Sequence, residues 1–235
     1  MAPDNSRRTG LRLESGPVPG LLREKQAMGG KSDLVAIRDR LSGGDLSSIG
    51  RANAVARRAR REPKTVRVLV ALMLGQDRLI AARAADALEK ASMAAPGILD
   101  PYRVTLATAI RRDRPPEVEW HLCQMLPRLD LDGAEARRAI EWLAGRFRDA
   151  ESRIVKAEAL TAACAIAARY PRHAGTADAL MAEALQSDIP AVRARARKLK
   201  ARPITPDAPR QERGLEPRQR SGKQRGTKPR LCNPR

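Results

Sequence analysis

One apolar pattern returns along this chain at a nearly constant interval, and it constrains the fold more than any other feature. In residues 77–91, DRLIAARAADALEKA, apolar side chains recur at the spacing of one helix face. Four triplets share the pattern: Ile80, Ala84 and Leu88; Val118, Leu122 and Leu126; Val155, Ala159 and Ala163; Val192, Ala196 and Leu199. Their first residues are separated by 38, 37 and 37 residues. A fixed period of this length is typical of stacked helical repeats.

A second helix fits between successive triplets, so the unit is predicted to be two helices and a turn. Pro63 at a first helical position and Gly75 at the end predict a helix of about eleven residues between them. Asp77, Asp100 and Asp132 each stand where an N-cap is expected, and Pro101 follows Asp100 as a first helical residue. Aromatic residues are only 2% of the chain, which favours closely packed helices over strands. The sequence therefore predicts an all-α fold.

The segments DRLIAARAADALEK and DIPAVRARARKL resemble the HEAT-repeat family, in which an aspartate turn leads into a helix with the pattern Val-Arg-x-x-Ala-x-x-Ala-Leu. Arg193 follows Val192 at the family's basic position, whereas Ala81 and Glu119 occupy it in two other units. The resemblance covers roughly residues 45–201. It implies a right-handed α-solenoid of antiparallel HEAT-like helix pairs with a concave surface used chiefly for binding. An irregular α-helical domain with helices of similar length is the alternative that the sequence leaves open.

Composition divides the chain into three parts. Residues 1–30 are punctuated by Gly and Pro, and residues 202–235 contain six prolines, so neither segment can bury enough apolar area to offset the entropy of ordering. We predict a disordered leader at 1–30, a HEAT-like helical repeat domain at 31–201 and a disordered basic tail at 202–235. The leader lacks the apolar core of a secretory signal, and three scattered cysteines form no disulfide framework. These features favour the cytoplasm, and no apolar run is long enough to predict a membrane partner.

The net charge of +19 predicts attraction to anions such as nucleic acid. Two arginine-rich segments of the repeat region and the tail carry much of it. The candidate polyanion-binding residues are Arg51, Arg57, Arg58, Arg60, Arg61, Lys64 and Arg67 in the first segment, and Arg193, Arg195, Arg197, Lys198 and Lys200 in the second. Phosphate neutralisation there would give salt-sensitive affinity with little sequence preference. The alternative is a solvated basic surface in an arginine-rich chain.

No constellation of catalytic residues emerges. His121 and His173 have no ligand partner at helical spacing, and His121 is expected on a helix surface. Cys123 and Cys164 are expected to be small buried hydrophobes. The exposed face of residues 77–91 is expected to carry Arg83, Asp86, Glu89 and Lys90. The sequence therefore predicts no enzyme activity, no cofactor and no metal.

The function predicted from these features is a non-catalytic binding module or scaffold for a protein partner. Nucleic-acid binding through the arginine clusters and tail is the alternative. A third reading comes from the resemblance: some proteins similar to HEAT stacks are alkylpurine DNA glycosylases that hold a damaged nucleotide with aromatic residues and an aspartate. Trp120, Trp142 and Asp113 are the residues that would serve such a role, although no motif places them.

Overall fold

The computed structural model describes residues 28–46, 48 and 50–205, and the secondary structure within these ranges is entirely helical. The α-helices are α1 (Met28–Leu41), α2 (Ala52–Ala59), α3 (Pro63–Met73), α4 (Arg78–Ala94), α5 (Arg103–Ala109), α6 (Pro116–Met125), α7 (Gly133–Asp149), α8 (Arg153–Arg169), α9 (Ala174–Leu185) and α10 (Pro190–Ala201). Three short 3-10 segments join them: η2 (Pro96–Tyr102), η3 (Leu126–Arg128) and η4 (Pro171–His173). The predicted all-α class is confirmed.

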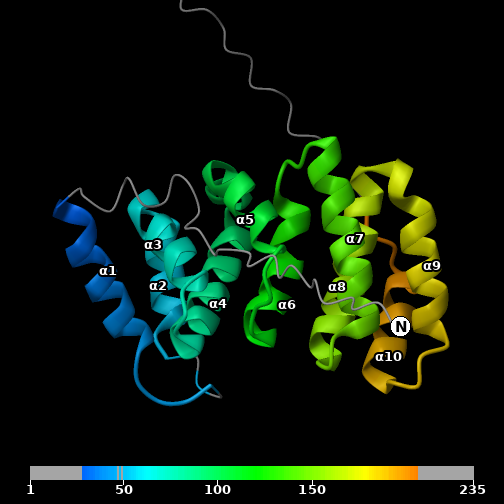
Figure 1. Ribbon diagram of the computed structural model, residues 1–235, viewed down its shortest axis with the longest axis horizontal. Coiled ribbons are helices and arrows are strands. Elements are labelled where there is room, and N and C mark those ends of the chain that lie inside the picture. Colours follow the sequence, from blue (N-terminus) through cyan, green and yellow to red (C-terminus); the bar gives the residue numbers. More distant parts are fainter. Residues whose placement is uncertain (1–27, 47, 49, 206–235) are drawn as a thin grey trace, which may run out of the picture. The chain divides into compact units, whose positions relative to one another are not determined.

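The helices of the compact unit that ends at Thr205 follow one another in chain order (Figure 1). The even-numbered helices form one layer, because α2 packs on α4, α4 on α6, α6 on α8 and α8 on α10. On the other side, α3 packs on α4, α7 on α8, and α9 on both α8 and α10. A further helix therefore separates each even-numbered helix from the next along the chain, as the sequence predicts for a two-helix unit.

The core is built from the repeated apolar pattern. All twelve residues of the four triplets are buried, with Leu199 the most exposed at 9%. Alanine occupies a large share of these positions and of their neighbours, so the helices can approach one another closely with little side-chain entropy lost. The interval found in the sequence thus corresponds to one step along the even-numbered layer.

The structure confirms some of the helix starts that the sequence predicts. Pro63 opens the eleven-residue helix α3. The Asp77 side chain accepts from the Ile80 N–H at the start of α4, and Asp132 forms a capping box with Glu135 at the start of α7. Asp100 does not cap a helix, because residues 96–102 form a 3-10 segment and α5 begins at Arg103. The prediction that Asp100 is an N-cap was wrong, because the chain is already in a 3-10 helix from Pro96 onward.

The predicted ends of the chain fall largely outside the described residues. Helix α1 begins at Met28, three residues before the expected start of the repeat domain. Residues 1–27 of the expected leader and residues 206–235 of the expected tail, which include Cys232, are not described. Within the described ranges, no helix combines the length and apolar character needed to cross a bilayer.

Candidate binding faces of the helical unit

Arg83 on α4 is buried, which corrects the expectation that it lies on an exposed face. Its side chain turns back one interval and donates to backbone carbonyls at the end of α1 and in the following loop: Leu41 at 2.6 Å, Gly43 at 2.5 Å, Asp45 at 2.8 Å and Ser48 at 3.0 Å. Only 3% of the residue is exposed. The last carbonyls of a helix have no partner within the helix, so this guanidinium satisfies groups that would otherwise need water.

Other arginines make the same kind of contact with a helix one interval earlier. Arg114 donates to the Leu74 carbonyl at the end of α3, and Arg169 donates to the Pro127 and Leu129 carbonyls at η3. Arg128 reaches both the backbone and the carboxylate of Glu89, which is buried rather than exposed as expected. These contacts span 39 to 42 residues. Part of the arginine content of the chain therefore holds neighbouring units together.

The outer face of the even-numbered layer is the side that points away from α3, α7 and α9. On α6, Glu119 accepts from Arg146 of α7 at 2.9 Å and marks the side toward α7. Trp120 and Gln124 are half-buried and lie on the side of the helix opposite the buried Leu122. Trp120 was considered in the sequence only as a glycosylase residue. Its spacing from Leu122 could have predicted its outward position, because Leu122 belongs to the buried triplet.

Polar contacts link neighbouring helices along this outer face. Lys90 of α4 donates to the Asn53 side chain of α2 at 2.8 Å and pairs with Asp86 at 2.7 Å. Asp86 in turn lies 4.0 Å from His121 of α6. Further along, Arg195 of α10 pairs with Glu158 of α8 at 2.9 Å and donates to Thr161. Charges in the middle of the outer face are therefore largely compensated within the protein.

His121 is buried, and the prediction that it lies on a helix surface was wrong. Its Nδ1 is 3.0 Å from the Gln124 side-chain oxygen, and the ring packs edge-on against Trp120. Burial lowers the pKa of His121 below its ordinary value, in spite of the opposing attraction of Asp86 and Glu89. The neutral ring is therefore favoured in the folded protein.

The first arginine-rich segment lies at the α2–α3 corner, and only some of its charges are neutralised. Arg58 pairs with Asp33 and Glu62, and Lys64 pairs with Asp33 at 3.3 Å. Arg67 is exposed on α3. The exposed residues of this segment that have no ion pair in the described part of the chain are Arg51, Arg57, Arg60 and Arg61.

The second segment forms helix α10. Arg195 is neutralised by Glu158, and the Arg193 side chain donates to the Ser187 carbonyl. Arg197, Lys198 and Lys200 are exposed, and no ion pair involves them within the described ranges. The two predicted clusters therefore lie at the α2–α3 corner and on α10.

The structure does not bring the other residues considered for catalysis or metal binding into one site. Trp142 packs against the core from α7, whereas Trp120 faces outward from α6, and Asp113 is exposed in the loop after α5. Burial raises the pKa of the Cys123 thiol, and it raises that of Cys164 to about 11. Among the described residues there is no group of His, Cys, Asp and Glu that could hold a metal ion.

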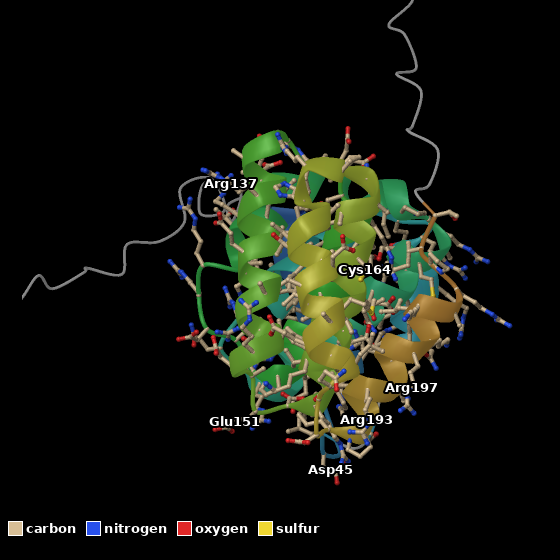
Figure 2. The ribbon with its side chains drawn as sticks, turned by 90° about the vertical axis from the view of Figure 1, so that its right-hand side faces the viewer. Asp45, Arg137, Glu151, Cys164, Arg193 and Arg197 are labelled. Atoms are coloured by element: carbon tan, nitrogen blue, oxygen red, sulfur yellow. The ribbon has the colours of Figure 1, made fainter. Side chains whose placement is uncertain are left out.

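Cys164, labelled in Figure 2, borders a partly open, mostly apolar pocket of about 250 Å³ between α8, α9 and α10. Its other walls include Ala168, Asp178, Met181, Leu199 and Ile204. Because the thiol is protonated at neutral pH, it behaves here as an apolar wall residue. Comparison of the chain with protein-family models, with curated proteins and with solved structures gives no match.

Proposed function

We propose that the described unit is a right-handed α-solenoid of HEAT-like helix pairs that serves as a non-catalytic binding module in the cytoplasm. The proposal is supported by the regular step of the buried triplets and by the alternation of even-numbered and intervening helices. It is supported further by arginine contacts that span one interval. Repeat stacks of this kind bury a continuous core and leave an extended face free for a partner.

The partner proposed first is a protein that docks on the outer face of the even-numbered layer. The observation that carries this proposal is the outward position of Trp120 in the middle of that face. Tryptophan supplies a large contact area and is enriched at the energetically dominant positions of protein interfaces. Ile154 of α8 and Met93 of α4 add exposed apolar side chains, at 48% and 63% exposure.

Affinity capture from a cell extract tests this docking face. Trp120→Ala should lose a protein that the unaltered chain retains, whereas Val104→Ala should retain it. Val104 is a suitable control because it is 61% exposed on α5, outside the even-numbered layer. Capture of the same proteins by the unaltered chain and by Trp120→Ala would show that the outer face is not the docking surface.

Nucleic acid is the second candidate partner, favoured by the exposed cations of the α2–α3 corner and of α10 that have no ion pair within the described residues. Binding of random duplex DNA or of single-stranded RNA should be measurable by gel shift at about 50 mM salt and should collapse at about 200 mM. Absence of binding at the lower salt would exclude it. Alkylpurine glycosylase activity has its own assay, release of methylated purine from alkylated DNA, and we expect none.

A further inference from the structure

Helix α10 is the last described helix, and one of its sides is open. Its inner side carries Val192, Ala196 and Leu199, which are buried, and α10 packs on α8 and α9. On the opposite side, Ala194 and Ala201 are exposed, two turns apart. We refer to these two alanines as the alanine strip.

Two rows of cations flank the alanine strip. One row consists of Arg193, Arg197 and Lys200, and the other of Arg195 and Lys198, with Arg202 directly after the end of the helix. Within the helix the spacing in each row is three or four residues, which places the side chains above one another on one flank. Figure 2 shows Arg193 and Arg197 on α10 at this end of the unit.

Most of these positive charges are not neutralised within the protein. Arg195 is paired with Glu158. The bond from Arg193 to the Ser187 carbonyl leaves the charge of its guanidinium in place. The other four side chains are exposed, and no ion pair involves them in the ranges that the structure describes. Both flanks of the helix therefore carry net positive charge, with small apolar side chains between them.

We propose that α10 inserts into the major groove of B-form DNA, with the alanine strip toward the groove floor and the two rows on the phosphates of the opposite strands. The groove is about 12 Å wide, close to the diameter of about 10–12 Å of a helix with its side chains. The inference rests on the second candidate of the proposed function and names the nucleic acid and the helix that binds it.

This arrangement predicts a preference for DNA over duplex RNA and little dependence on DNA sequence. The major groove of A-form RNA is too narrow and deep to admit a helix, so duplex RNA is a poor ligand for this arrangement. Alanine carries no side-chain donor or acceptor for base edges, so the affinity depends little on DNA sequence.

The test measures fluorescence anisotropy of the full chain with a labelled 20-base-pair DNA and with duplex RNA of the same sequence. At about 50 mM salt the DNA should bind at least about tenfold more tightly than the RNA. Arg197→Gln with Lys200→Gln, and separately Lys198→Gln with Arg202→Gln, should each weaken DNA binding roughly tenfold. Each pair should also reduce the slope of log affinity against log salt by about 2.

Two control variants separate groove insertion from general attraction. Arg57→Gln with Arg60→Gln removes the same charge from the α2–α3 corner and should weaken binding far less. Ala194→Leu adds bulk to the alanine strip without changing charge and should weaken DNA binding severalfold, whereas Ala182→Leu at an exposed site on α9 should not. Circular dichroism checks that every variant keeps its helix content.

Equal binding of DNA and RNA duplexes would overturn the inference, as would equal losses from the α2 and α10 pairs or no effect of Ala194→Leu. Binding of polyglutamate as tightly as DNA would also overturn it and would favour an acidic protein on α10. If no DNA binds while a protein partner is still captured through Trp120, the inference fails and the proposed binding module stands. If Trp120→Ala changes nothing and DNA binds as described, the first proposed partner fails and the inference stands.

Discussion

Between α4 and α8, several arginine side chains are bound to other parts of the chain, whereas on α10 the side chain of Arg197 is exposed. Arg83 and Arg197 illustrate the contrast. Arg83 donates to four backbone carbonyls and is 3% exposed, whereas Arg197 is exposed and has no ion pair in the described part of the chain. Both lie on even-numbered helices. The comparison teaches that an arginine is structural where acceptors of the preceding unit lie within its reach, and that residue type alone does not decide this.

The largest effect is expected from Arg83→Met. The substitution keeps the aliphatic stem but leaves four carbonyls without their donor, and it should lower the free energy of unfolding by about 3 kcal/mol. Urea denaturation followed by circular dichroism measures this loss. Arg57→Met, which removes an exposed arginine from α2, should change the stability little. Similar losses from the two variants would break the distinction between interior and terminal arginines.

The next effect is expected at Arg128, which reaches the buried residue Glu89. Arg128→Met leaves that carboxylate without its guanidinium and should cost about 2 kcal/mol. Arg148→Met is a matched control, because Arg148 pairs with Glu183 at the same 2.6 Å but both side chains are about half exposed. Solvent screening should make the control loss small. Thermal unfolding of the two variants compares them, and a larger loss from the Arg148 substitution would contradict the role of burial.

A pH-dependent contribution is expected from His121 in the middle of the stack. Because burial lowers the pKa of His121 in the folded protein, the unfolded chain binds a proton first as the pH falls. Stability should therefore be full above the ordinary histidine pKa of about 6.5 and should decline below it. His121→Gln should flatten this decline between about pH 7.5 and 5. His173→Gln should retain most of it, and an unchanged slope in His121→Gln would refute the assignment.

The smallest effect on stability is expected at the terminal helix. Replacing Arg197, Lys198 and Lys200 together by Gln should change the free energy of unfolding by less than about 0.5 kcal/mol. These exposed side chains have no ion pair to lose within the part of the chain that the structure describes, and glutamine is nearly as good a helix former. Differential scanning calorimetry can measure the change. A loss comparable to that of Arg83→Met would show that α10 is also held by its charges.

The core was predictable from the sequence because burial follows periodicity. Ile80, Val118, Val155 and Val192 lie at equivalent places on four helices, and each is buried with the other members of its triplet. A helix buries the same face wherever the same neighbour lies beside it. The helix caps were less predictable. Asp100 has the sequence context of an N-cap, yet the preceding proline has already started a 3-10 segment there.

The destinations of the arginines were not predictable from one helix considered alone. Arg83 stands close in sequence to Asp86, Glu89 and Lys90, which suggests an exposed face, but its acceptors lie at the end of α1 and in the following loop, 35 to 42 residues earlier. A usable signal existed in the spacing of opposite charges. Arg195 and Glu158 are 37 residues apart, and Arg128 and Glu89 are 39 apart, close to the interval of the apolar triplets. A search for charge pairs at the repeat interval would have found them.

The direction of the arginine contacts has a consequence for synthesis of the chain. Arg83, Arg114, Arg128 and Arg169 all donate to carbonyls that precede them in the sequence. A chain that leaves the ribosome from its N-terminus therefore exposes the acceptors first and receives each donor only after about forty further residues have been translated. The Leu41 carbonyl at the end of α1 therefore lacks its guanidinium donor until residue 83 has emerged from the ribosome. Growth of the nascent chain is thus coupled, unit by unit, to closure of the unit before it.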